Sequence, residues 1–262
     1  MKIFFYSILL IFFIFNNSFS KNTKLRIQDN YSDQITWKHI KFNLPEGEWI
    51  YYDKSPWVIH NFHGSCASFL NIVNKVAAGH YEICYVESGG KLRQILGAFF
   101  QAELKNGKYD SCLLRPEYFY AKFVFIGVSS NCFLTRHIDP FKELNFPDDP
   151  EDKYQARLKK YLKDKSINLS KIGLNYNSIY YSNRNDKAIF VNYTVDPEFI
   201  GAPKTLYNGE NTSEYHRDNI NNYPLKKKFF KLWTKNMSQE HSYLEDQLKA
   251  SDKFKLNFLD LD

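Results

Sequence analysis

The order of strand-like and helix-like segments is the feature that most limits the fold of this chain. Over residues 35–138, apolar residues alternate with polar ones or form short runs rich in Phe, Tyr, Val and Ile, which is typical of β-strands. A helix over 150–163, a β-hairpin over 172–195 and a second helix over 225–249 follow. Strands and helices do not alternate as a parallel sheet requires. We therefore expect an α+β fold, in which a mid-chain helix and a C-terminal amphipathic helix pack on a mostly antiparallel sheet.

Turn residues divide the strand-rich segments into hairpins. Residues 41–52 contain a Pro-Glu-Gly turn at 45–47, which predicts a hairpin. The strands of the 172–195 hairpin alternate regularly, and Asn-rich residues 183–186 form its turn. Residues 67–78 are ambiguous, because their apolar spacing fits a short helix while their β-branched content fits a strand equally well.

The two predicted helices differ in the signals that identify them. Asp149 can cap the mid-chain helix, and Pro150 suits its first turn. The C-terminal helix places Phe229, Trp233 and Met237 on one face, because residues four apart lie one turn apart. We expect these three side chains to be mostly buried against the sheet.

The first twenty residues have the parts of a signal peptide. Lys2 supplies the positive charge, residues 3–15 form an apolar run, and Ser18 and Ser20 offer small side chains for cleavage. A membrane-spanning helix needs about 20 apolar residues, so a permanent anchor is the less favoured alternative. The sequence therefore predicts cleavage before Lys21.

The mature chain is long enough to form one large domain with its own core. We predict a single extracytoplasmic domain over residues 21–262, whose first residues, 21–33, form a loose polar leader. The periplasm is the expected compartment, with secretion as the alternative. The formal net charge of +6 is modest. It is insufficient to predict nucleic-acid binding but compatible with weak attraction to an anionic surface.

Four cysteines are present: Cys66, Cys84, Cys112 and Cys132. An even number in an exported chain favours two disulfides, although a metal site and buried free thiols remain alternatives. Closing a loop costs less between sequence neighbours. We therefore predict the pairs Cys66–Cys84 and Cys112–Cys132.

His60, His63 and Cys66 form an H-x-x-H-x-x-C pattern of potential metal ligands. On a strand, however, His63 would point to the face opposite that of His60 and Cys66. A disulfide at Cys66 would also remove the third ligand. We predict neither a metal site nor a cofactor.

Candidate catalytic residues are few. His137 and Asp139 would lie on one strand face, as an acid–base pair requires. A nucleophilic pair could also combine Cys66 or Cys132 with His63 or His137. Such pairs arise by chance in a chain with 7 His and 29 acidic residues, so they are weak signals.

The C-terminal helix begins with a basic segment. Lys226, Lys227, Lys228 and Lys231 lie beside aromatic residues such as Trp233, a combination found in helices that lie on membranes. The alternative is that the apolar face packs on the sheet and leaves these lysines in water. We favour packing, and keep membrane or anion contact by the four lysines as the alternative.

No pattern in the sequence identifies an enzyme class. We therefore expect an exported, non-catalytic domain that binds a protein or small-molecule ligand. One alternative is an extracytoplasmic hydrolase that uses His137 with Asp139 or a Cys/His pair. The other is a peripheral membrane-surface protein that uses its basic C-terminal helix.

Overall fold

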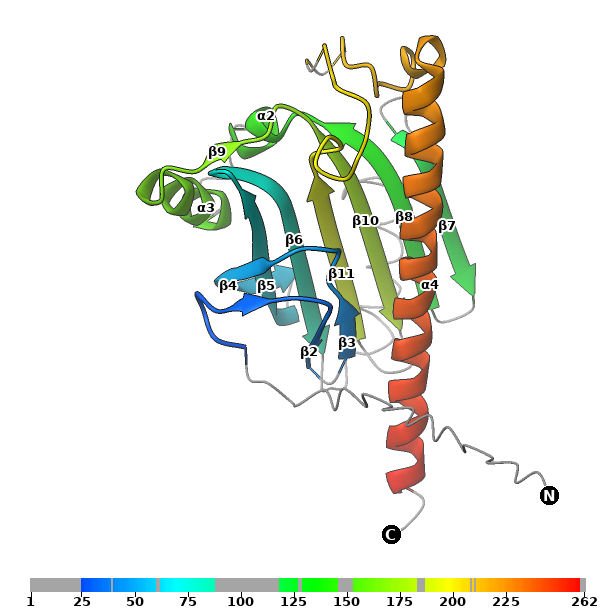
Figure 1. Ribbon diagram of the computed structural model, residues 1–262. Helices are drawn as coiled ribbons and strands as arrows, with labels where there is room; N and C mark the ends of the chain where they lie inside the picture. Colours follow the sequence, from blue (N-terminus) through cyan, green and yellow to red (C-terminus); the bar gives the residue numbers. More distant parts are fainter. Residues whose placement is uncertain are drawn as a thin grey trace, which may run out of the picture.

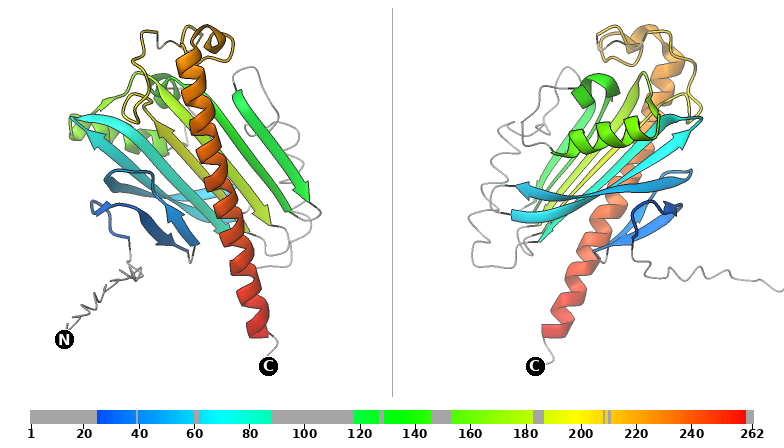
Figure 2. Two further views of the ribbon diagram at one scale, coloured as in Figure 1. Left: turned by 45° about the vertical axis from the view of Figure 1, so that its right-hand side comes forward. Right: turned by 90° about the vertical axis from the view of Figure 1, so that its left-hand side faces the viewer.

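An antiparallel sheet lies at the centre of the fold, with a long helix on one face and a short helix on the other (Figures 1 and 2). The computed structural model describes residues 25–38, 40–59, 62–87, 118–126, 129–145, 153–182, 187–207, 209 and 211–259. The predicted signal peptide lies outside the described residues and stays a prediction.

In pairing order, the main strands are β1 (Asn30–Tyr31), β4 (Trp49–Ile59), β5 (Phe62–Val73), β6 (Val76–Glu87), β11 (Lys187–Val195), β10 (Gly173–Ser182), β8 (Ser129–Ile138) and β7 (Tyr118–Ile126). Each pairs antiparallel with its neighbours. The short strand β9 (Asn168–Leu169) pairs in parallel with β6. The strands β2 (Gln34–Trp37) and β3 (Ile40–Asn43) form a separate antiparallel pair.

The helices are α2 (Pro140–Asn145), α3 (Lys153–Asp164), a 3-10 turn (Ile220–Asn222) and α4 (Pro224–Leu259). The predicted α+β fold with a C-terminal helix packed on the sheet is therefore confirmed. The helix α4 extends well past its predicted end at residue 249, whereas α2 was not predicted. The capping signals expected for α3 lie outside the described residues. Within the described part of the chain, no helix combines the length and apolarity needed to cross a membrane.

The predicted hairpins had different outcomes. The hairpin over 172–195 is confirmed as the β10–β11 pair. The hairpin over 41–52 is wrong, because β3 pairs with β2 while β4 pairs with β1 and β5. Residues 45–47 instead connect the small sheet to the large one. Gly47 has φ 124°, a backbone conformation that favours glycine.

The ambiguous segment 67–78 forms a strand, a tight turn and the start of another strand. Val73 pairs with Val76, and the turn residues Asn74 and Lys75 have φ values of 50° and 62°. Two consecutive left-handed residues form the turn whose twist matches that of the flanking strands. The result is the long β5–β6 hairpin.

Adjacent residues of β5 point to opposite faces of the sheet and so belong to different hydrophobic clusters. Phe69 joins the larger cluster, which includes residues of the β2–β3 pair and of α4. Leu70 joins the smaller cluster, where Leu158 and Leu162 of α3 pack. Figure 2 accordingly shows α3 and α4 on opposite sides of the sheet.

The face that α4 presents to the sheet differs in part from the predicted one. Trp233 is buried as expected, with 6% of its surface exposed, and its ring centroid lies 6.2 Å from that of Tyr193. Phe229 and Met237 are only half-buried, although both pack against the same cluster. Phe230, between them and fully buried, completes the packed face.

Lys226 is not part of a solvent-facing basic end. It lies one turn before Phe230 on the inner side of α4 and is buried. Its Nζ forms an ion pair with the buried carboxylate of Glu214 and donates a hydrogen bond to the carbonyl oxygen of Lys204 at 2.7 Å. Burial of a lysine requires such a partner. The pair attaches the segment between β11 and α4 to the helix.

Candidate functional site

A groove of about 570 Å³ lies between α2, α3 and residues 167–171. Ligand pockets commonly have volumes of roughly 300–1,000 Å³ and mostly apolar linings with a few polar groups. The apolar side chains that line this groove are Phe141, Leu144, Leu162, Ile167 and Leu169. Phe141 keeps 66% of its surface exposed, so an apolar wall faces outward at one side of the groove.

Two local features fix the walls of the groove. Asp139 caps α2, since its Oδ1 accepts the backbone N–H groups of Phe141 at 3.0 Å and Lys142 at 3.2 Å. The strand β9 is held against β6, and the N–H of Asn168 donates to the carbonyl oxygen of Lys75 at 2.8 Å. Hydrogen-bonded secondary structure, and not loops alone, therefore forms the walls of the groove.

Basic side chains give the groove its charge. Lys159 is half-buried and Lys171 is exposed, and both line it. Neither ammonium group forms a hydrogen bond or ion pair with another residue in the part of the chain that the structure describes. The one carboxylate in the lining, Asp139, is engaged as the cap of α2. The groove can therefore offer two ammonium groups to an anion.

The predicted pair His137 and Asp139 lines a different, smaller pocket of about 90 Å³. The structure adds His216, whose ring centroid lies 5.2 Å from that of His137 in a T-shaped arrangement. Arg136 and Glu143 also line the pocket, with 3.6 Å between their charged groups. His216 comes from the segment between β11 and α4, so no local pattern could have predicted its contact with His137.

The chemistry of this pocket does not favour the hydrolase alternative over a binding role. The N–H of Asp218 donates to Nδ1 of His216 at 3.3 Å, and the Asp218 carboxylate lies 3.7 Å from the same nitrogen. The carboxylate of Asp139 is used by the α2 cap. A volume of about 90 Å³ corresponds to about three water molecules. The residues described around the pocket contribute no Ser, Thr or Cys nucleophile.

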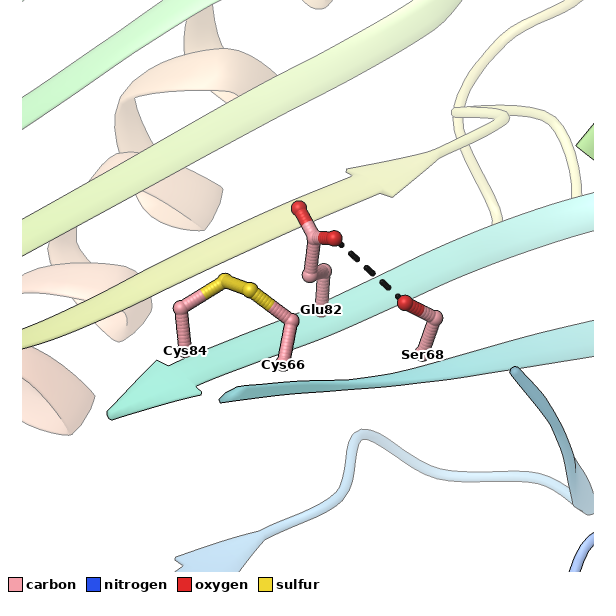
Figure 3. Close-up of a disulfide and its surroundings, with 4 residues drawn as sticks. All are labelled: Cys66, Ser68, Glu82 and Cys84. Carbon is pink, nitrogen blue, oxygen red and sulfur yellow. Dashed lines mark hydrogen bonds between the residues drawn. A yellow bond between two sulfur atoms is a disulfide. The ribbon is translucent and has the colours of Figure 1, made fainter. Parts of the chain in front are cut away.

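The predicted disulfide between Cys66 and Cys84 is confirmed. The two residues lie directly opposite each other on β5 and β6, with Cα atoms 4.0 Å apart. Figure 3 shows Glu82 on the same face, where its Oε1 accepts a hydrogen bond from Ser68 Oγ at 3.4 Å. The two sulfurs and a Glu82 carboxylate oxygen lie within 4.8 Å of one another. The disulfide, however, uses the thiolates that a metal would need.

The other cysteine and histidine candidates are only partly described. Cys132 is disulfide-bonded, so neither it nor Cys66 offers a thiolate for a Cys/His pair. Cys112, its predicted partner, lies outside the described residues, and this pairing stays a prediction. His60 also lies outside them, and the side chain of His63 is not described.

A serine–histidine pair that the sequence did not reveal lies between β10 and α4. Ser178 Oγ and His241 Nδ1 are 2.6 Å apart, within the range of a nucleophile and its base. Burial lowers the pKa of His241 to about 4, so the imidazole is neutral at neutral pH. Ser178 is only 3% exposed. With the Thr135–Thr234 contact of 3.1 Å, the pair attaches α4 to the sheet.

Tyrosines form a buried row beneath α4. Tyr81, Tyr193 and Tyr176 lie directly opposite one another on β6, β11 and β10. Burial raises the pKa of each phenol and that of Glu240 on α4. The hydroxyls of Tyr81 and Tyr176 and Oε1 of Glu240 have no hydrogen-bond partner among the described residues. Each of the three tyrosines is at most 3% exposed, so the row is closed to ligands in this structure.

The basic start of α4 retains three of its four predicted lysines. Lys228 and Lys231 are exposed. Lys227 is half-buried and donates to Oδ1 of Asn221 at 2.6 Å. Lys226 is excluded because it is buried in its ion pair with Glu214.

The groove between α2 and α3 is the candidate site, because it combines volume, an apolar lining and charged groups with no partner in the described chain. Of its residues, sequence analysis had singled out only Asp139, and for another role. The others come from three segments that carry no common motif. Comparison of the chain with protein-family models, with curated proteins and with solved structures finds no match.

Proposed function

We propose that the protein is an exported, non-catalytic binding protein whose groove between α2 and α3 holds an amphipathic anion. Such a ligand has an apolar chain and a carboxylate or similar head group. The observation that carries this proposal is the combination of an apolar wall with two lysines, Lys159 and Lys171, that have no partner in the described structure. The head group would neutralise the lysines, and the chain would cover the exposed ring of Phe141.

An upper limit to the affinity follows from the contacts expected of a ten-carbon ligand. Burying about 150 Å² of apolar chain contributes roughly 4 kcal/mol. A charge-assisted hydrogen bond to a lysine contributes about 2 kcal/mol more. Part of this sum of about 6 kcal/mol offsets the freedom that the ligand loses on binding, so a Kd of roughly 40 μM is the tightest affinity that these contacts support. Binding of this strength is measurable by calorimetry.

The test uses three ten-carbon probes that differ in charge: decanoate, decanol and decyltrimethylammonium. Decanoate should bind with a 1:1 stoichiometry, and the cation should bind at least tenfold more weakly. The variant Lys159→Glu should reduce decanoate affinity at least tenfold, because it places a like charge beside the carboxylate. Lys163→Glu is the matched control, since Lys163 lies on the same helix, is exposed and does not line the groove.

Two outcomes would contradict the proposal. One is that no probe binds saturably. The other is that Lys159→Glu and Lys163→Glu change decanoate affinity equally, which would indicate only a general charge effect.

Export is the second part of the proposal. It is supported by the N-terminal signal pattern and by the Cys66–Cys84 disulfide, which is the kind of bond that persists in oxidising compartments. The periplasm is the proposed compartment, and secretion the alternative. N-terminal sequencing of native protein should begin at Lys21. A native chain that retains Met1 and fractionates with membranes would show that the segment is an anchor.

A further inference from the structure

Exposed apolar side chains gather where α4 begins. In the described part of the chain, nine large hydrophobic side chains are exposed. Six of them belong to residues 199–207 or to the first three turns of α4: Phe199, Ile200, Leu206, Tyr207, Leu225 and Leu232. Scattered exposed residues are normal on protein surfaces, but a concentration in two adjoining segments indicates an interaction surface.

The two segments are joined by the buried ion pair described above. Lys226 donates to the carbonyl oxygen of Lys204, and its partner Glu214 accepts the N–H of Leu206 at 3.3 Å. Residues 204–206 are therefore fixed beside the first turn of α4, at the end of the molecule seen at the top of Figure 1. We call residues 199–207 and the outer side of α4 from residue 225 to residue 235 the apical surface.

The charge of the apical surface is positive. Lys228, Lys231 and Lys235 are exposed, and Leu225, Lys228, Leu232 and Lys235 follow one another at spacings of three or four residues on one face of the helix. Glu198, an exposed acid that directly precedes residues 199–207, accepts the N–H of Thr205 at 2.6 Å. Leucines and lysines are thus interspersed rather than divided into an apolar centre and a charged rim.

We propose that the apical surface binds an anionic lipid membrane. Leu225 and Leu232, which are 71% and 58% exposed, would enter the head-group region. The long lysine side chains beside them can extend to the lipid phosphates while their apolar stems stay with the leucines. Beyond residue 235 the exposed positions of this face are neutral at Gln239 and Ser242 and acidic at Asp246. The contact therefore involves one end of the molecule and does not extend along α4.

The experiment measures co-sedimentation of the full mature protein with vesicles. Vesicles of phosphatidylglycerol and phosphatidylcholine should retain the protein, pure phosphatidylcholine should not, and added salt should weaken retention. The variant Leu225→Glu/Leu232→Glu should reduce the partition coefficient at least tenfold. The control variant Gln239→Glu/Ser242→Glu makes the same charge change on the same helix, outside the apical surface. It should reduce the partition coefficient less than threefold.

Every outcome decides the proposal. Failure of the wild type to bind, or equal binding to both vesicle types, would overturn it. An equal loss in the two double variants would also overturn it, because net charge alone would then explain the attraction. A wild type that dimerises in sedimentation velocity, while the leucine variant is monomeric and neither binds vesicles, would assign the surface to self-association. The variant Lys228→Gln/Lys231→Gln replaces two exposed side chains. It should make vesicle binding less dependent on salt without changing the melting temperature.

Discussion

Replacement of Lys226 by methionine tests the most unexpected interaction in the structure. The side chain keeps its length but loses its charge, so Glu214, which is 2% exposed, is left in the protein interior without a counter-charge. Removing one member of a buried ion pair costs about 3–5 kcal/mol. The N–H of Leu206 still donates to the Glu214 carboxylate, which places the expected loss near the lower end, at about 3 kcal/mol.

Two further variants separate this effect from general consequences of the substitution. Lys228→Met makes the same change two residues away in water, and should alter stability by less than about 0.5 kcal/mol. Lys226→Met/Glu214→Gln removes both charges, and should recover most of the loss because no buried charge remains.

Urea unfolding followed by tryptophan fluorescence measures all three variants. With an m value of about 2–3 kcal/mol/M, a loss of about 3 kcal/mol lowers the midpoint by about 1–1.5 M urea. If Lys226→Met and Lys228→Met had the same midpoint, or if the double variant were no more stable than Lys226→Met, the assigned ion pair would be refuted.

Three other predictions follow from buried groups. Trp233→Ala should cost about 3–5 kcal/mol in urea unfolding, whereas Leu232→Ala, at an exposed neighbour, should change stability by less than about 0.5 kcal/mol. The variant Cys66→Ala/Cys84→Ala should lower the free energy of unfolding by about 3 kcal/mol, because the disulfide closes a loop over a sequence separation of 18. A loss below about 1 kcal/mol would contradict this account. Burial lowers the pKa of His241 from 6.5 to about 4. Since the folded state then binds this proton less readily, wild type should lose about 2.5 kcal/mol more stability than His241→Gln as pH falls from about 6.5 to 4. Stability profiles of the two proteins that run parallel over this pH range would refute the prediction.

The fold class could be predicted because the period-2 pattern and the helix signals are local properties of the sequence. The pairing of strands could be predicted only in part, since the 172–195 hairpin is confirmed whereas residues 41–52 do not form one. A turn signal such as Pro45–Gly47 reports that the chain changes direction, but the same local signal is present whether or not the flanking strands pair. Here β3, which precedes the turn, pairs with β2, whereas β4, which follows it, joins the main sheet.

The environment of single side chains was harder to predict, as the lysines of α4 show. Lys226 and Lys228 look equivalent in the sequence, yet one is buried and the other is exposed. The difference depends on the rotation of α4 against the sheet and on Glu214, which lies in an irregular segment. The groove was missed for a similar reason, because Lys159 and Lys171 come from separate segments and line one groove only in the folded chain, where β9 pairs with β6.

The order of strands in the sheet has a consequence for how the chain folds as it is synthesised. Pairings such as β5–β6 and β10–β11 join neighbours in the sequence, whereas β6 and β11 join residues about 100 positions apart, as in the pair of Glu87 with Lys187. The β4–β6 block can therefore form early, and the pairing of β6 with β11 is expected to limit the folding rate. Until β11 has emerged, β6 presents an unpaired strand edge to other chains. This intermediate is the species most exposed to aggregation, and a chaperone that covers the β6 edge would protect it.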